Sequence, residues 1–384
     1  MSNPKYYITI VILICSFRLT YAQEQESTIA INGYGGWAMA VTDGNTYLGG
    51  NEDGGFDELQ FAINSTASPI ERLTITGQIN WYSQAQKFET EIAFAFAEWV
   101  FSERLKLRIG RVKHVFGIYS EIYSVGTIRP FFSLPQGIYG HSDIVAEGFN
   151  GIGFTGAHFF INSHWGIQYD AYWGQFDYKA FEIWDFFSID EEDAKTVAAE
   201  EFVFERARSF GGRINIFSGI PGLKYGFSGY YGINDFGENE GETENTTRFV
   251  IGLHFEYLAD KIWSRSEFAR LSDQEADNKD LVNTAYAELG YKISPQIQLA
   301  AGFDFSEADK PEFVNTEFSS YLEHKDWAIG ANYWFSPNFV VKSALHLVDG
   351  NRYALNKELL FNAESDDKLK ETTRLFQLGA QFSF

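Results

Sequence analysis

The chain has 384 residues, and 17% of them are aromatic, with 37 Phe, 21 Tyr and 9 Trp but only 8 Pro. Its formal net charge of -22 argues against binding to nucleic acid, which requires a basic surface. Cys15 is the single cysteine and falls in an expected N-terminal signal, so a mature chain would contain neither a disulfide framework nor a cysteine metal site.

The first 22 residues have the pattern of a secretory signal. Lys5 and the amino terminus supply a positive start, residues 7–17 form an apolar core, and Thr20-Tyr21-Ala22 resembles a cleavage site. Beyond this segment no apolar run is long enough for a membrane-spanning helix. We therefore predict a signal peptide over residues 1–22 and one mature domain over residues 23–384, without a linker.

Apolar and polar residues alternate in many segments of the mature chain, as in strands with one apolar and one polar face. Leu59, Phe61 and Ile63, for example, alternate with Gln60 and Asn64. The pattern predicts about sixteen strands, an even number that is typical of single-chain bacterial barrels. In chain order they are expected at residues 28–41, 57–67, 72–83, 88–101, 104–112, 149–160, 164–178, 205–217, 222–234, 246–258, 261–272, 281–293, 296–306, 325–336, 338–349 and 372–384.

The connections between these segments are alternately short and long. Ser102-Glu103 is a tight turn, for instance, whereas the next connection extends over residues 113–148. A barrel with tight turns at one end and long loops at the other has this alternation. The sequence therefore predicts an all-β fold, a transmembrane antiparallel β-barrel. The acidic runs, such as Asp190-Glu191-Glu192-Asp193, fall in the long loops, so the net charge does not predict cation selectivity.

The third long loop, residues 113–148, is expected to fold into the lumen and narrow it. Phe131, Phe132, Leu134 and Ile138 would be costly to leave together in water. Small residues, Ala93, Ala95 and Ala97 on one strand and Gly33 to Ala40 on the first, are expected to leave room for this loop or for a neighbouring barrel.

Charged residues close to this loop are the candidates for a pore constriction that binds solutes. The set that we predict is Lys106, Arg108, Arg111, Lys113, His114, Glu121 and Arg129. An alternative is that a watery wall simply tolerates charge, as it would at the other predicted lumen positions: Lys224, Arg248, His254, Lys292, Lys342, Asp170, Glu256, Glu288 and Asp304. The seven His form no catalytic motif, and we expect no cofactor, no metal ion and no enzymatic activity.

The last strand ends Leu378-Gly379-Ala380-Gln381-Phe382-Ser383-Phe384, which resembles the C-terminal strand of bacterial outer-membrane barrels. Sixteen strands with an inward third loop resemble the trimeric outer-membrane porins. The segment from Gly110-Arg111 to Arg129-Pro130-Phe131 is similar to the phosphate-selective porin type, although the arginine ladder of that family is not evident here.

This resemblance implies a Gram-negative outer-membrane protein that is exported through the signal, contacts outer-membrane lipid and lipopolysaccharide, and assembles as a homotrimer. The barrel assembly machinery would recognise the strand that ends at Phe384. The implied function is passive diffusion of small hydrophilic solutes and ions. The alternatives are a substrate-selective channel for anions or carboxylates, a structural or adhesive barrel, and an outer-membrane enzyme.

Overall fold

The computed structural model describes most of the chain from residue 28 to residue 384. The predicted signal peptide and the acidic run at residues 190–193 lie outside the described residues. The segments left out are residues 1–27, 44, 85–86, 141–143, 162, 164, 180–203, 236–244, 276–277, 310–318 and 355–369.

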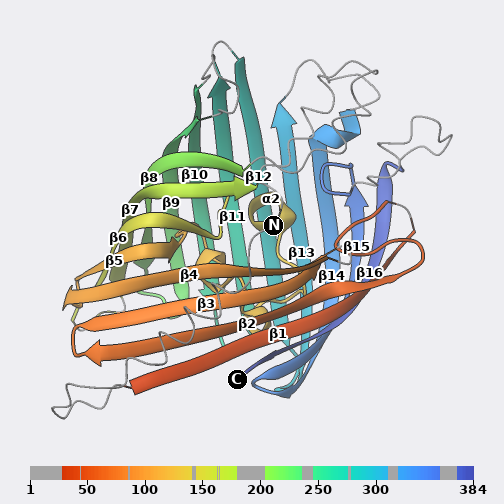
Figure 1. The fold of residues 1–384 in the computed structure, drawn as a ribbon. Helices are drawn as coiled ribbons and strands as arrows, with labels where there is room; N and C mark the ends of the chain where they lie inside the picture. Colours follow the sequence, from red (N-terminus) through yellow and green to blue (C-terminus); the bar gives the residue numbers. More distant parts are fainter. Residues whose placement is uncertain are drawn as a thin grey trace, which may run out of the picture.

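Within the described residues, sixteen antiparallel strands form one closed barrel, which confirms the predicted fold class (Figure 1). The largest differences from the predicted bounds are three residues, as at the end of β2, predicted at 67 and observed at Ile70. The strands are β1 (Thr28–Thr42), β2 (Gly55–Ile70), β3 (Leu73–Gln84), β4 (Lys87–Ser102), β5 (Leu105–Lys113), β6 (Gly148–Phe159), β7 (Gly166–Lys179), β8 (Phe204–Phe217), β9 (Leu223–Asp235), β10 (Asn245–Leu258), β11 (Ile262–Glu275), β12 (Asn278–Lys292), β13 (Ile297–Asp309), β14 (Glu323–Ser336), β15 (Phe339–Asp349) and β16 (Thr372–Ser383).

The barrel closes where β16 pairs with β1, with Tyr34 opposite Ser383. The backbone N–H of Phe384 also donates to the carbonyl oxygen of Gly33 over 2.9 Å. The rings of Phe384 and Phe382 occupy the space where a Cβ at Gly33 or Gly35 would lie. The small residues of β1 therefore accommodate the C-terminal aromatic residues on the outer side of the barrel.

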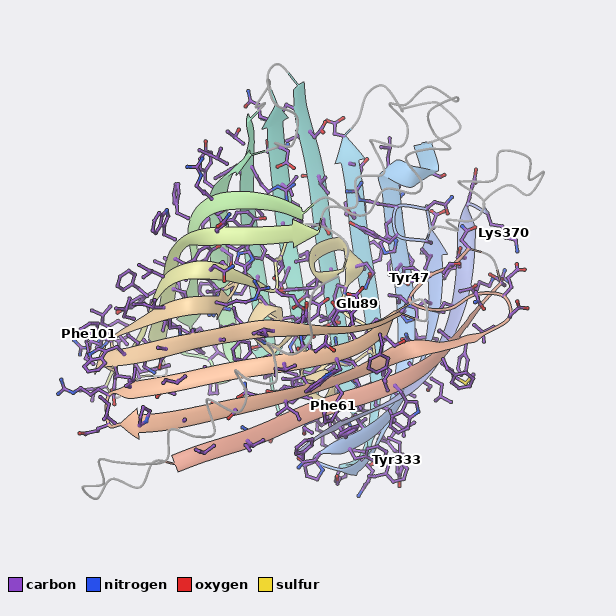
Figure 2. The ribbon with its side chains drawn as sticks, viewed as in Figure 1. Tyr47, Phe61, Glu89, Phe101, Tyr333 and Lys370 are labelled. Atoms are coloured by element: carbon purple, nitrogen blue, oxygen red, sulfur yellow. The ribbon has the colours of Figure 1, made fainter. Side chains whose placement is uncertain are left out.

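The two faces of the wall differ as the period-2 pattern predicts. On β14, Trp327 and Ile329 are exposed on the outer side, whereas Asp326 and Ala328 are buried on the inner side. Figure 2 shows the many side chains, Phe101 among them, that project from the outer surface. No helix among the described residues is long and apolar enough to cross a membrane.

Strand β4 contains a bulge that overturns the expected inward position of Ala95. Gln78 pairs with Phe94 and Ile79 pairs with Ile92, so Ala93 is an extra residue in β4. A bulge reverses which side chains face inward beyond it. Phe94 is therefore buried inside the barrel, and Ala95 is exposed on the outer surface.

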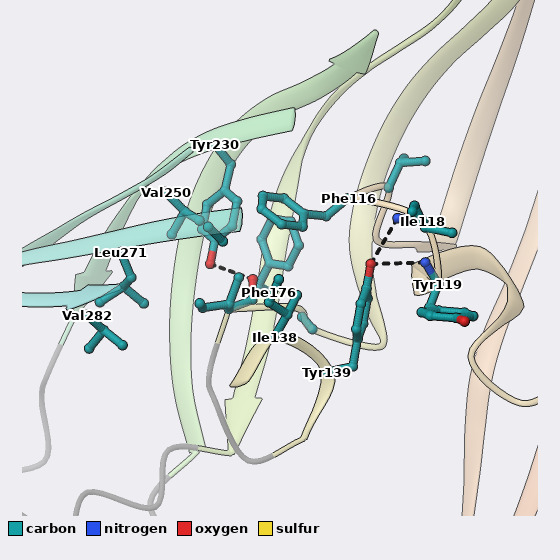
Figure 3. Packing of buried hydrophobic residues seen from close by; sticks show 14 of the residues in the cluster. Phe116, Ile118, Tyr119, Ile138, Tyr139, Phe176, Tyr230, Val250, Leu271 and Val282 are labelled. Atoms are coloured by element: carbon teal, nitrogen blue, oxygen red, sulfur yellow. Dashed lines mark hydrogen bonds between the residues drawn. The ribbon is translucent and has the colours of Figure 1, made fainter. Parts of the chain in front are cut away.

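The third long loop lies inside the barrel, as predicted from its apolar residues. Its described residues are 114–140 and 144–147, and they contain three short helices, η1 (Ser120–Ile122), η2 (Gly126–Ile128) and α2 (Gln136–Tyr139). Its buried residues, including Phe116 and Ile138, join one apolar cluster with Tyr230 and Val250 of the wall (Figure 3).

Candidate functional site

The inner wall holds the third loop through its peptide groups. The Lys342 ammonium group donates to the carbonyl oxygens of Gly126, Arg129 and Phe131 over 2.8, 2.7 and 3.1 Å. Lys342 is buried, and its three donors are thereby matched by three acceptors. One lysine of β15 thus fixes the central part of the loop.

Glu267 of β11 fixes the loop at two further points. Its Oε1 accepts hydrogen bonds from the Tyr139 hydroxyl over 2.6 Å and from the backbone N–H of Ile118 over 3.0 Å. Gly117 has a φ of +56°, and a Cβ there would collide with the Glu267 carboxylate. The glycine therefore allows both the turn and the close approach to Glu267.

The aromatic residues at the tip of the loop pack on glycines of the wall. A Cβ at Gly302 would lie 2.7 Å from the Phe131 ring, and a Cβ at Gly379 would lie 2.5 Å from the Phe132 ring. Gly36 of β1 also contacts Phe132. The expectation that small residues of the first strand make room for the loop is therefore met at Gly36, whereas Gly302 and Gly379 were not among the predicted positions.

A chain of opposite charges connects the wall of β4 and β5 with this loop. The Glu98 carboxylate lies 3.7 Å from Lys106 Nζ and 2.7 Å from Arg108 Nε. Arg108 Nη1 in turn lies 3.7 Å from Glu121 Oε1 of η1. Glu98 and Arg108 are direct cross-strand partners, so the tight turn at residues 103–104 sets this contact.

The chain of charges continues from Glu121 to strands β8 and β7 of the barrel wall. Arg213 Nη2 of β8 lies 2.5 Å from Glu121 Oε2 and 3.0 Å from Asp170 Oδ2 of β7. Asp170 and Arg213 are also cross-strand partners. Three cations and three carboxylates therefore alternate, and their formal charges cancel.

One end of this chain of charges, here called the wet end, is exposed to water, and the other end is buried. The side chains of Lys106, Arg108 and Glu121 are 37%, 21% and 33% exposed, whereas Arg213 and Asp170 are almost fully buried. Burial alone would raise the pKa of the Glu121 carboxyl, but the Arg213 guanidinium and, more weakly, Arg108 hold that pKa below its ordinary value. Glu121 is therefore ionised at neutral pH.

Lys113 joins this group, because its Nζ donates to the carbonyl oxygen of Glu121 over 2.8 Å and lies above the Phe94 ring. Four of the seven predicted residues, Lys106, Arg108, Lys113 and Glu121, are thus brought together. The structure places the other three predicted residues elsewhere.

His114 is fully buried among aromatic residues. Its Nδ1 accepts from the N–H of Ala146, so Nε2 carries the hydrogen that faces the Tyr172 hydroxyl at 2.8 Å. Burial, together with the nearby Arg213, lowers the pKa of His114 to about 3. His114 is therefore a neutral packing residue rather than a residue that faces a solute.

Arg129 is also buried, beside the wall, and its carbonyl oxygen accepts from Lys342. Arg111 pairs with Ala95 and Asn150, both of which are exposed on the outer surface, and its Nε donates to the carbonyl oxygen of Ile92. The position of Arg111 therefore belongs to the outward-facing set of β5, contrary to the expected lumen position.

The sequence-based set omitted Glu98 and Arg213, which connect the predicted residues. The register of the hairpin between β4 and β5 would have placed Glu98 opposite Arg108, and the register of β7 and β8 would have placed Arg213 opposite Asp170. Within the described part of the chain, no three His, Cys, Asp or Glu side chains come together as ligands of a metal ion do.

The sequence matches no protein-family model and no curated protein. Solved structures with a similar fold include an anion-selective porin from Comamonas acidovorans, with 12% identity, 94% of this chain and 100% of that chain covered, and a TM-score of 0.58. The trimer form of OmpT, an outer membrane protein of Vibrio cholerae, has 11% identity, the same coverage and a TM-score of 0.58. The outer membrane channel DcaP of Acinetobacter baumannii has 9% identity, 95% and 99% coverage, and a TM-score of 0.55. At these identities the likeness establishes the fold, which is that of outer-membrane barrels.

Proposed function

We propose that this protein is an outer-membrane porin through which small hydrophilic solutes and ions diffuse passively. The observation that carries the proposal is the uneven filling of the lumen. Inward residues of β13 to β15 are buried under the third loop, whereas Asn32, Asn64, Thr66 and Thr76 on β1 to β3 remain exposed or half-buried. A passage lined by amides and hydroxyls would therefore run between the loop and this part of the wall.

The inward orientation of that wall is supported by its register. Asn32 pairs with Asn64, and Asn64 pairs with Gln78. Gln78 Nε2 donates to the Ser124 hydroxyl of the third loop over 3.1 Å. The row therefore faces the same interior as the loop, and the loop is the element that narrows the passage.

The outer surface supports placement in a membrane. Large apolar side chains stay exposed around the barrel, for example Ile31 on β1, Phe154 on β6, Leu253 on β10 and Trp327 on β14. A continuous apolar belt of this kind suits the hydrocarbon core of a bilayer and would be unfavourable in water. We accordingly assign the barrel to the outer membrane, after export through a cleaved signal at residues 1–22.

The wet end of the chain of charges would act on ions that pass the constriction. Lys106 and Arg108 present positive charge, and Glu121 presents negative charge, at the edge of the third loop. Because the charges alternate over a few ångströms, they orient polar solutes and disfavour apolar ones. We assign Lys106, Arg108, Lys113 and Glu121 to this constriction, with Glu98 and Arg213 holding them in position.

A channel selective for anions or carboxylates is the second candidate. It is favoured by the two cations at the wet end, and the similar protein from Comamonas acidovorans is described as an anion-selective porin. Current block by a carboxylated solute, but not by its neutral analogue, would separate this function from general diffusion.

We also propose a homotrimer that contacts lipid and lipopolysaccharide and that the barrel assembly machinery recognises at the strand ending in Phe384. The similar Vibrio cholerae protein has a trimer form. The backbone of Phe384 pairs with β1, so the last residue takes part in closing the barrel.

Swelling of liposomes that contain the purified protein tests the porin function. Vesicles should swell in a small neutral sugar and not in a large polysaccharide. A correctly folded barrel that leaves vesicles impermeable to both solutes would contradict the proposal.

A further inference from the structure

A row of four polar side chains, here called the outer polar row, crosses the wall of the barrel from β5 to β8. Arg111 of β5 is the direct cross-strand partner of Asn150 of β6. Gln175 of β7 pairs with Asn150 on one side and with Arg208 of β8 on the other. The four strands are neighbours in the sheet (Figure 1). The row therefore places a cation, two amides and a second cation side by side at one level of the wall.

The outer polar row faces away from the lumen. Each of its members has a buried neighbour in the same strand, and these neighbours are Val112, Phe149, Phe176 and Ser209. The first three pack in the apolar cluster that the third loop forms with the inner wall. Successive side chains of a strand point to opposite faces of the sheet, so the row belongs to the outer face. All of its side chains are exposed or partly exposed.

A second row, here called the outer apolar row, lies next to the outer polar row on the side toward the middle of the barrel. Ile152 of β6 pairs with Ile109 of β5 and with Trp173 of β7, and Trp173 pairs with Phe210 of β8. Ile109, Trp173 and Phe210 are all exposed. Each member is two positions from a member of the polar row in its own strand, so both rows share the outer face. Such a change from apolar to polar side chains suits the border of the hydrocarbon core of a bilayer.

The outer polar row is close to the end of the barrel from which the third loop extends. β5 ends at Lys113 and β6 begins at Gly148, and the loop connects these two ends. Long loops of outer-membrane barrels are extracellular, so the row would lie at the outer leaflet. This step rests on the proposed function, which places the barrel in the outer membrane. An arginine on the lipid-facing side is costly at the middle of a bilayer but costs little at its border, which is consistent with this depth.

The order of side chains in the row matches a headgroup with two separated anions. Neighbouring strands lie about 4.8 Å apart, so the backbones of Arg111 and Arg208 are roughly 14 Å apart along the wall. A bond from Arg111 Nε to the carbonyl oxygen of Ile92 holds that guanidinium against the wall. Arginine pairs with phosphate through parallel hydrogen bonds. Side-chain amides both donate and accept, as contact with sugar hydroxyls requires, and two of them separate the arginines.

We propose that the outer polar row binds a glycolipid of the outer leaflet whose headgroup is a sugar pair with a phosphate at each end. The two arginines each pair with one phosphate, and the two amides bond to the sugars between them. The acyl chains of the same lipid lie on the outer apolar row. The bound lipid stays on the outer surface of the barrel, so it does not enter the passage beside the third loop.

Native mass spectrometry of the purified full-length protein in detergent, titrated with diphosphorylated lipid A, measures this binding without channel activity. The matched probe is lipid A from which both phosphates have been removed, because its acyl chains are the same. We expect the diphosphorylated form to bind about 25-fold more tightly, since each arginine near an anionic membrane surface strengthens binding about fivefold. Equal affinity for the two forms would overturn the proposal.

The double variant Arg111→Gln, Arg208→Gln should bind diphosphorylated lipid A about 25-fold more weakly than the wild type and should bind the dephosphorylated form unchanged. Arg270→Gln is the control and should keep the wild-type affinity. Arg270 is exposed on the outer face of β11, but its partner Asn283 pairs with Glu307 rather than with a second cation. An equal loss of affinity in the double variant and the control would overturn the proposal, because any outer arginine would then suffice.

Single-channel recordings separate this proposal from the porin function. The double variant should open as the wild type does, because the outer polar row lies outside the lumen. Normal openings without phosphate-dependent binding would overturn the lipid site alone, whereas phosphate-dependent binding by a barrel without openings would support it and contradict the porin function. If the double variant does not fold, Arg208→Gln alone, at an exposed position, should weaken binding about fivefold, and an unchanged affinity would overturn the proposal.

Discussion

Glu121 of the third loop lies between two arginines of the barrel wall, 2.5 Å from Arg213 Nη2 and 3.7 Å from Arg108 Nη1. Both arginines also contact a carboxylate of their own strand pair, Asp170 and Glu98 respectively. Of the six charged side chains in this series, the barrel wall contributes five, and the loop contributes the remaining one, Glu121. Its position makes it the most informative residue for a test of ion preference.

Replacing Glu121 with Gln should increase the preference for anions. The change removes a negative charge at the wet end and leaves Arg108 and Arg213 with less compensation, while the size of the side chain is kept. The reversal potential under a salt gradient should move toward the anion equilibrium potential. Glu307→Gln removes the same charge from an exposed position of β13 and serves as the control. An equal shift of the reversal potential in both variants would mean that ion preference does not depend on where in the barrel the charge lies.

Replacing Lys342 with Met should loosen the third loop. Three carbonyl oxygens, those of Gly126, Arg129 and Phe131, would lose the Lys342 donor, although that of Gly126 still accepts from the N–H of Arg129. A buried acceptor without a partner costs about 1–3 kcal/mol. We expect a lower unfolding temperature and more frequent current fluctuations in single-channel recordings. Lys292→Met, at an exposed position near the end of β12, serves as the control and should change neither quantity. A Lys342→Met variant with the unfolding temperature and the current fluctuations of the wild type would argue against this anchor.

The folded protein should lose stability in acid, because His114 is buried and neutral. Burial and the nearby Arg213 lower its pKa in the folded protein to about 3, whereas an unfolded chain has a His pKa of about 6.5. As the pH falls below about 6.5, the unfolded state binds a proton that the folded state does not, so stability is lost progressively down to about pH 3.

The free energy of unfolding falls by at most about 1.4 kcal/mol per pH unit. Relative to neutral pH, the total loss at pH 5 is about 2 kcal/mol. The unfolding temperature of His114→Gln, measured at pH 7.5 and pH 5, should fall less over this interval than that of the wild type. The difference between the two proteins isolates His114 from every other titrating group. Parallel pH profiles would show that His114 does not titrate as its burial requires.

Two substitutions on opposite faces of the wall test the packing of the loop. Gly379→Val places atoms where the Phe132 ring lies, so it should displace the tip of the loop and cost about 1–3 kcal/mol of stability. Ala95→Trp adds a larger side chain on the outer surface and should leave conductance unchanged. A lower conductance in Ala95→Trp would indicate that Ala95 faces the lumen, as the sequence pattern alone suggests.

The strands were predictable because an apolar outer face and a polar inner face impose a period of two on every segment of the wall. The third loop was predictable for a related reason, since Phe131, Phe132 and Ile138 need a buried environment. The bulge at Ala93 left no signal in the pattern, because alanine and phenylalanine fit either face. One inserted residue then reversed the facing of Ala95.

The candidate site was only partly predictable because it joins residues distant in sequence. Lys106, Arg108 and Lys113 precede the loop directly, and proximity in sequence was enough to group them with Glu121. The contact of Glu121 with Arg213 depends on how the loop folds across the lumen, which no local pattern encodes. His114 and Arg129 were included for their charge, although their neighbours bury both of them.

Single-channel conductance of the refolded protein in a planar bilayer tests whether the barrel contains a water-filled passage beside the third loop. We expect discrete openings, which occur in groups of three if the protein is a trimer. We also expect a reversal potential that Glu121→Gln moves toward anion preference. A barrel that keeps its β-sheet signature and its resistance to heat in detergent, yet shows no openings, would rule out the proposed porin function.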